Sequence, residues 1–390
     1  MELSALQAAS LADDVYALTQ YDRLDDAILF LSSKYKDSFN LSSDNLIKGK
    51  TGGPSLLKCR TAFGFALLGT GRFKGHVFLL FRGTQYLADW LTNFNIGVSR
   101  SRYGNPAHDG FNTAFKSIEP QLSQFMESVR ASNIHSVHCI GHSLGGALAT
   151  LCSEWVHSAF GIAPYLYTYG SPRVGLIGFA AMCTQKIGCD RIFRVYHKTD
   201  VVPCIPLWPF IHTPNIGKDY YLPSPGFLVG AEYHSMKHYI TSVRGKEWNA
   251  LGRQPERKSD EDIAKWLKTD TPVNMTSTVL EWLGHAINYV INKCASGVSW
   301  IISGAASASL TIMDQLAYII STSVNLAETI SSWVIFLMRK IMRLLGHQHI
   351  VDSADMTHEF VRGILRKLQQ RVNQIAQSAL SDALVNGRAI

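Results

Sequence analysis

The sequence is low in charge for its length and has no cluster of basic residues. Of its 390 residues, 17% are charged, and 37 Lys and Arg against 30 Asp and Glu leave a formal net charge of +7. The basic residues are scattered, whereas a nucleic-acid-binding chain gathers them in stripes or in a known motif. We therefore expect no nucleic-acid partner. The positive balance favours an anionic membrane surface, unless it is only a generic basic composition.

Paired cysteines and a secretory leader are also absent. None of the seven cysteines forms a C-x-x-C pair, so we predict neither a metal site nor a redox motif, and no cofactor. Cys139 and Cys152 lie in apolar segments and are expected to be buried. The stretch 1–16 has neither the basic start nor the apolar run of a signal peptide. We expect folding in the cytoplasm and, if the protein is exported, a signal-independent route.

Composition divides the chain into two regions. Residues 1–250 are predicted to form one domain, and residues 260–390 a helical extension, joined by a charged stretch at 252–262 that contains helix-breaking residues. The extension is apolar from 279 to 345, and residues 294–313 carry no charge over about the length that spans a bilayer. Its many small and hydroxyl residues suit close helix packing in protein or in lipid. The extension is therefore expected to pack on a core, a partner or a membrane.

Strands and helices alternate in the first region. We expect helices at 3–18 and 110–128, and strands at 61–68, 76–81, 134–140, 165–169 and 191–196. This alternation is typical of a mainly parallel sheet flanked by helices. The predicted fold class is α/β with a C-terminal all-helical extension.

A possible nucleophile lies where one of these strands should turn into a helix. The run Gly141–Gly145 fits G-x-S-x-G, with a β-branched segment before it and small apolar residues after it. Such a strand–serine–helix turn holds the serine hydroxyl exposed in a strained position, so Ser143 is predicted to be catalytic. The amide of Leu144 would be one oxyanion donor. A second donor is expected from Thr84, which follows a strand and offers both an amide and a hydroxyl.

A serine nucleophile needs a base and an acid that orients it. Asp200 follows the end of a strand, where catalytic groups gather in open α/β sheets. Of the downstream histidines, we favour His234 as the base because it lies at a loop-to-helix junction, and His238 is the alternative. Their spacing of four could bind zinc, but Ser235 stands where a metalloprotease has its glutamate. His212, between two prolines, is expected to be structural.

A series of motifs in this region resembles the class 3 (fungal-type) lipase family. The matching blocks occur in order at Phe81–Thr84, Asp89–Asn93, His108–Phe111, Gly141–Gly146, Tyr169–Gly175 and Asp200–Pro203. The resemblance implies an α/β-hydrolase fold, hydrolysis of lipid acyl esters, a triad that includes Ser143 and Asp200, and an oxyanion donor at Thr84. It also implies a lid after Thr84, where an apolar face would comprise Tyr86, Leu87, Trp90, Leu91 and Phe94.

The extension lies outside this resemblance. A lipase domain with an apolar helical extension and no leader is similar in outline to bacterial antibacterial lipase effectors, which would imply a cognate immunity protein as partner. The preferred hypothesis is an A-type phospholipase acting on membrane phospholipid. The alternatives are an intracellular triacylglycerol or diacylglycerol lipase and, in a different class, a catalytically silent scaffold that binds lipid or a partner.

Overall fold

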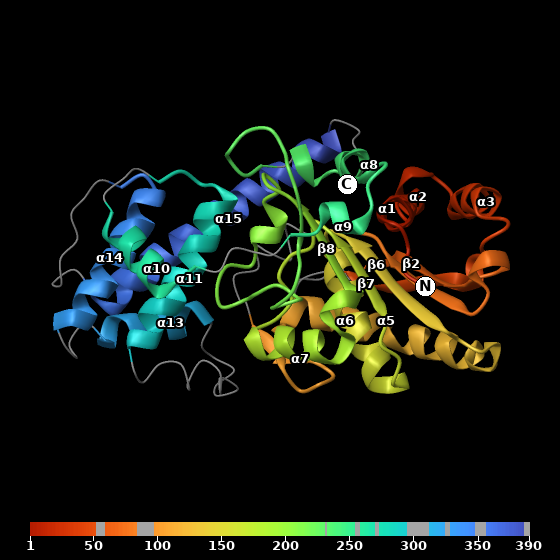
Figure 1. The fold of residues 1–390 in the computed structure, drawn as a ribbon, viewed down its shortest axis with the longest axis horizontal. Helices are drawn as coiled ribbons and strands as arrows, with labels where there is room; N and C mark the ends of the chain where they lie inside the picture. Colours follow the sequence, from red (N-terminus) through yellow and green to blue (C-terminus); the bar gives the residue numbers. More distant parts are fainter. Residues whose placement is uncertain are drawn as a thin grey trace.

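The α/β prediction is confirmed by a seven-stranded sheet with helices on both faces, next to a helical C-terminal region (Figure 1). The computed structural model describes residues 1–51, 59–83, 97–230, 232–253, 258–269, 273–294, 312–323, 328–347 and 356–385. The sheet order is β1-β2-β3-β6-β7-β8-β9. Its strands are β1 (Leu46–Thr51), β2 (Cys59–Leu68), β3 (His76–Phe81), β6 (Ser136–His142), β7 (Tyr165–Tyr169), β8 (Ile192–His197) and β9 (Tyr220–Leu222).

The sheet is antiparallel at one edge and parallel through its centre. β1, β2 and β3 pair antiparallel, and β3, β6, β7, β8 and β9 pair parallel in that order. Every residue of β3, β6 and β8 is buried, as expected for parallel strands covered on both faces. A separate ribbon pairs β4 (Val98–Arg100) with β5 (Pro106–His108). Because these strands are parallel, the segments that follow β3, β6, β7 and β8 all lie at the carboxyl end of the strands.

Two groups of helices cover the sheet (Figure 1). On one face α1 packs against β3, β6 and β7 and also against α8, while on the other face α6 packs against the same three strands and against α5 and α7. These elements are α1 (Ala5–Asp14), α5 (Asp109–Ser128), α6 (Leu144–Phe160), α7 (Ile177–Ile187) and α8 (Met236–Val243). The remaining helices of this region are α2 (Ala17–Gln20), α3 (Leu24–Lys34) and α9 (Trp248–Leu251).

The C-terminal region is a group of packed helices. It comprises α10 (Asp260–Lys268), α11 (Ser277–Lys293), α13 (Ile312–Ser323), α14 (Glu328–Leu344) and α15 (His358–Val385). α14 contacts α10, α11, α13 and α15. Among the helices that the structure describes, none combines the length and apolarity needed to cross a bilayer. The uncharged stretch singled out in the sequence lies, from 295 to 311, outside the described residues.

A buried lysine holds α14 against α10. Lys340 is 2% exposed, and its Nζ donates to the carbonyl and hydroxyl oxygens of Thr269 at 2.6 and 2.8 Å. The same ammonium lies 5.0 Å from the ring centroid of Trp266. A buried cation needs such partners to offset its desolvation. This part of the extension is therefore held by packing between helices.

The helical region contacts the α/β region at two short 3-10 helices. α11 packs against η5 (Val202–Cys204), and α15 packs against η6 (Glu232–His234). Both 3-10 helices lie close in sequence to predicted site residues. The extension is thus packed beside the candidate site.

Candidate active site

Ser143 lies at the turn between β6 and α6. It has φ 58° and ψ −130°, a conformation that costs a non-glycine residue about 1–3 kcal/mol and that clusters at active sites. A Cβ on Gly141 would lie 2.1 Å from the carbonyl oxygen of Gly145, and one on Gly145 would lie 2.1 Å from that of Phe81. The turn therefore needs glycine at both positions of the G-x-S-x-G pattern.

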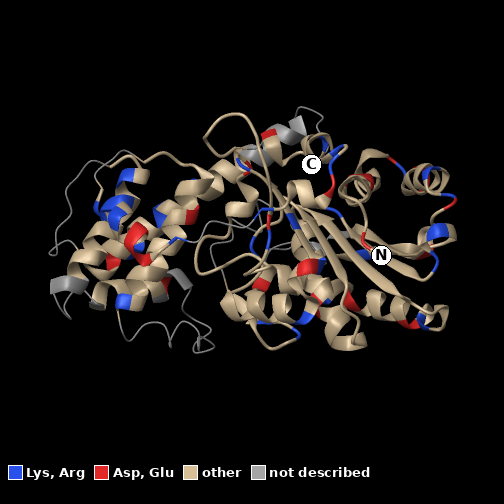
Figure 2. Ribbon diagram, in the orientation of Figure 1, with Lys and Arg blue, Asp and Glu red and all other residues tan. Residues whose placement is uncertain are grey.

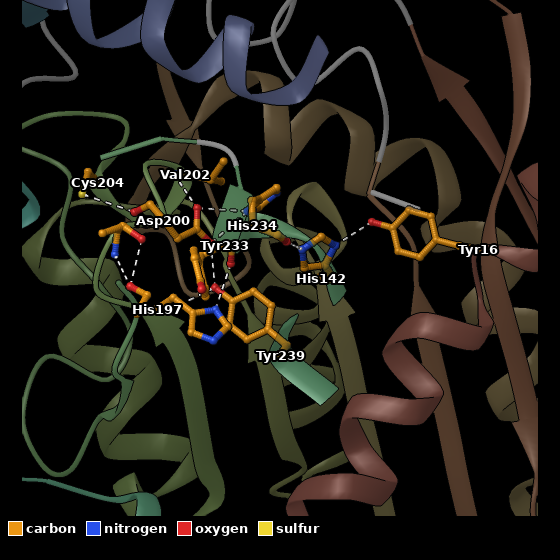
Figure 3. Close-up of polar contacts among 11 residues, drawn as sticks. Tyr16, His142, His197, Asp200, Val202, Cys204, Tyr233, His234 and Tyr239 are labelled. Atoms are coloured by element: carbon orange, nitrogen blue, oxygen red, sulfur yellow. Dashed lines mark hydrogen bonds and ion pairs between the residues drawn. The ribbon is translucent and has the colours of Figure 1, made fainter. Parts of the chain in front are cut away.

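Asp200 follows β8 and is held by three donors. Its carboxylate accepts from the Val202 amide at 2.9 Å, from the Tyr239 hydroxyl at 2.6 Å and from His234 Nδ1 at 2.9 and 3.0 Å to its two oxygens. The residue is 1% exposed. Burial, together with the neighbouring carboxylate, raises the pKa of Tyr239 well above its usual value, so this phenol stays a donor. These contacts fix the orientation of the carboxylate (Figure 3).

The two candidate histidines have different environments. His234 ends η6 and is 1% exposed, with Nδ1 on Asp200. His238 lies within α8, where its ring centroid is 4.5 Å from that of Tyr233. Because Asp200 accepts the hydrogen of His234 Nδ1, the lone pair of this imidazole is on Nε2. That is the tautomer a general base for a serine requires.

Two buried atoms of the predicted triad have no hydrogen-bond partner among the residues that the structure describes. They are Ser143 Oγ and His234 Nε2. A buried polar atom without a partner is uncommon and calls for a specific explanation. In a serine hydrolase these are the two atoms between which a proton passes, and their contact often tightens only with substrate bound.

A second histidine links the nucleophile turn to the N-terminal helices. The Tyr16 hydroxyl accepts from the Gly83 amide at 2.8 Å and lies 2.8 Å from His142 Nδ1, to which it donates its own hydrogen. His142 Nε2 is 2.7 Å from the carbonyl oxygen of His234, to which it donates. Burial, and then the neighbouring His234, lower the pKa of His142 well below its usual value. The neutral ring joins Tyr16 to His234 (Figure 3), and the Tyr16 hydroxyl extends this chain of hydrogen bonds to Gly83.

Replacing Tyr16 with phenylalanine should therefore destabilise the protein. The change leaves the Gly83 amide and His142 Nδ1 buried without partners, so we expect the free energy of unfolding in urea to fall by about 2 kcal/mol. Tyr21→Phe is the matched control, because Tyr21 is 38% exposed and its change should stay within about 0.5 kcal/mol. Equal stabilities for the two variants would contradict the predicted role of the Tyr16 hydroxyl.

The oxyanion candidates are described only in part. Leu144 is the first residue of α6, and amides in the first turn of a helix have no acceptor within the helix. A Cβ on Gly83 would lie 2.9 Å from Ser143 Cβ, so the end of β3 runs directly beside the nucleophile turn. Thr84 and the lid candidates Tyr86, Leu87, Trp90, Leu91 and Phe94 lie outside the described residues.

The predicted nucleophile and base are both buried. Ser143 is 0% exposed and His234 is 1% exposed. Figure 3 shows α15 passing above His234, in agreement with its packing against η6.

The sequence motifs assign no role to Tyr16, His142 or Tyr239, although His142 is the second residue of the G-x-S-x-G motif. Tyr16 is 126 positions from His142, and nothing in the local pattern links the two. His212 contacts Arg173 instead of Asp200: the Arg173 Nε donates to His212 Nε2 at 3.5 Å.

The comparisons with known proteins agree with the motif blocks. The family described as Lipase (class 3) matches residues 78–210. Residues 78–210 belong to the class 3 lipase family. This class 3 lipase segment contains Ser143 and Asp200, whereas His234 lies beyond its end.

Individual relatives include enzymes that act on different lipids. The chain is 33% identical to a secreted mono- and diacylglycerol lipase of Fusarium solani, over 39% of this chain and 45% of that protein. It is 26% identical to a phospholipase A1-II of Oryza sativa subsp. japonica, over 48% and 54%. The chain thus spans about half the length of the curated relatives it matches.

Solved lipase structures also align with the chain. A lipase from Rhizopus microsporus var. chinensis aligns with a TM-score of 0.41 at 22% identity, over 55% of this chain and 72% of that one. A nonglycosylated lipase of Yarrowia lipolytica aligns with a TM-score of 0.45 at 19% identity, over 57% and 80%.

Proposed function

We propose that this protein hydrolyses acyl esters of lipids through a serine-bound acyl intermediate. The observation that carries the proposal is that the buried atoms Ser143 Oγ and His234 Nε2 have no hydrogen-bond partner within the described part of the chain, while Asp200 holds the imidazole. Membership of residues 78–210 in the class 3 lipase family supports it. Among the residues that the structure describes, no group of three or more His, Cys, Asp or Glu is placed to hold a metal ion.

In the first step Ser143 Oγ attacks the ester carbonyl carbon while His234 Nε2 takes its proton. Asp200 stabilises the imidazolium that forms, through the existing bond to Nδ1. The negative charge on the carbonyl oxygen would be met by the Leu144 amide and by Thr84. The bond between the carbonyl carbon and the alcohol oxygen then breaks, and the alcohol leaves with the proton from His234.

In the second step water attacks the acyl-serine ester. His234 Nε2 takes a proton from the water, the acyl carbon–Oγ bond breaks, and Ser143 recovers its hydrogen as the fatty acid departs. Each step needs the same neutral His234 tautomer. The three donors on Asp200 preserve that tautomer between steps.

We infer that the substrate is a membrane phospholipid, cleaved as by an A-type phospholipase. The net charge of +7 favours an anionic surface, and one matched relative is named a phospholipase A1. The alternative is a glyceride, supported by the relative named a mono- and diacylglycerol lipase. Delivery as an antibacterial effector with a cognate immunity protein stays a prediction from the sequence.

The substrate class is tested by incubating the purified chain with vesicles that contain phospholipid, diacylglycerol and triacylglycerol. Mass spectrometry should find lysophospholipid and free fatty acid in equal amounts. Loss of glycerides with intact phospholipid would overturn the phospholipid assignment. If no lipid is consumed and a fluorophosphonate probe fails to label Ser143, the chain is a silent scaffold and the proposed hydrolase function is wrong.

A further inference from the structure

The loop at 223–229 is attached at both ends to the segment that carries Asp200. At its start, the Ser224 hydroxyl accepts from the Thr199 amide at 3.0 Å and lies 2.8 Å from the Thr199 hydroxyl oxygen. At its end, Gly230 donates to Thr199 and accepts from Val201. The loop therefore lies beyond the carboxyl end of β8, and in the sequence it falls between the predicted acid and the predicted base.

Two large apolar side chains project from this loop into solvent. Phe227 is 74% exposed and Leu228 is 61% exposed, although Val229 beside them is buried. Pro223 and Pro225 limit the freedom of the preceding backbone. Isolated exposed apolar residues are ordinary on protein surfaces. Two adjacent ones on a loop fixed to a candidate active site are not explained by the fold.

A cation accompanies this apolar pair. Lys198 Nζ lies 4.5 Å from the ring centroid of Phe227, and Lys198 itself is half-buried at the end of β8. From 223 to 234 the loop and η6 contain one acidic residue, Glu232. A lysine beside exposed aromatic and aliphatic side chains fits a bilayer interface, where apolar groups enter the acyl region and a cation meets anionic headgroups.

We propose that the 223–229 loop inserts Phe227 and Leu228 into an anionic phospholipid bilayer, with Lys198 on the headgroups. The inference deepens the proposed function, because it fixes which part of the protein meets the lipid surface. Insertion at this loop would bring the carboxyl end of the parallel strands, where Asp200 and His234 lie, against the bilayer. A lipid leaving the bilayer would then have a short path to Ser143.

The test measures co-sedimentation of the full chain with vesicles of phosphatidylcholine alone or of phosphatidylcholine and phosphatidylglycerol in equal amounts. Every protein carries Ser143→Ala, so that the lipids stay intact. Removing both apolar side chains with Phe227→Ser/Leu228→Ser should weaken binding to the mixed vesicles by about tenfold or more. Lys198→Gln should weaken binding by about fivefold on the mixed vesicles, with no change on phosphatidylcholine.

The matched control is Ile216→Ser. Ile216 is 60% exposed, but its neighbours place it near the amino end of β8, opposite the end where Asp200 lies. The Asn215 amide donates to Thr184 Oγ1 in α7, and a Cβ on Gly217 would touch Cys189, which precedes β8. This variant should bind both kinds of vesicle within about twofold of the Ser143→Ala protein, because its side chain would not meet the bilayer.

The outcomes separate this proposal from the proposed function. Equal binding by Phe227→Ser/Leu228→Ser and Ile216→Ser would overturn the loop proposal, as would a parent protein that binds neither vesicle. Hydrolysis of a soluble short-chain ester by the wild-type chain is measured in parallel. Its absence would count against the hydrolase function, whatever the vesicles show. Thermal unfolding of each variant establishes that a loss of binding is not a loss of fold.

Discussion

Ser143→Ala is expected to lower kcat/KM for ester hydrolysis by at least about 10⁴-fold, because it removes the oxygen that would form the acyl intermediate. Its effect on stability should be small. None of the residues that the structure describes forms a hydrogen bond with the Ser143 hydroxyl, so its removal should leave none of their buried polar groups newly unpaired. Alanine retains the Cβ, so the backbone at φ 58° is strained to a similar degree.

The measurement pairs steady-state kinetics on a soluble ester with urea unfolding of the same preparation. A large loss of activity at unchanged stability is the expected result, since it separates chemistry from folding. A variant that keeps a tenth or more of the wild-type rate would reject Ser143 as nucleophile. So would continued labelling by a fluorophosphonate probe.

His234→Ala should lower activity to about the level of Ser143→Ala, whereas His238→Ala should stay within about threefold of the wild type. The difference arises because Nδ1 of His234 is bound to Asp200, while His238, on α8, packs its ring against Tyr233. Residues that act as one unit are strongly non-additive. The Ser143→Ala/His234→Ala double variant should therefore lose little more than either single variant.

The control for this experiment is the pH profile of the His238→Ala variant. It should match that of the wild-type protein, because the titrating base would be unchanged. Loss of activity in His238→Ala with a nearly normal His234→Ala variant would reverse the assignment. A simple sum of the two losses in the Ser143→Ala/His234→Ala variant would show that these side chains do not act together.

Features that depend on a few neighbouring residues could be predicted from the sequence. The turn around Ser143 is one of them, because a β-branched strand, two glycines and a run of small residues determine its backbone within about ten positions. The parallel sheet is another, since apolar strand segments that alternate with helical segments are typical of a sheet covered on both faces. The ordered motif blocks located Asp200 for a similar reason, as an acidic residue just beyond the end of a strand.

Contacts between distant segments could not be predicted in this way. Tyr16 reaches His142 and Gly83 only because α1 packs on β3 and β6. The buried Lys340 likewise binds Thr269, which is 71 residues away. In both cases the contact depends on how distant segments pack together, and the residues of either segment alone do not indicate its partner.

The sequence by itself determined the α/β class, the strained turn at Ser143 and the family of residues 78–210, because these depend on local backbone preferences and on short motifs. It left His234 and His238 as alternatives, since both lie within reach of Asp200 along the chain. The tertiary structure gives the two histidines different surroundings: His234 Nδ1 lies 2.9 Å from the carboxylate of Asp200, whereas the ring of His238 packs against Tyr233. It also placed α15 over the site and Phe227 and Leu228 in solvent beside it. Such placements follow from burial of apolar surface across the whole molecule, which no local pattern records.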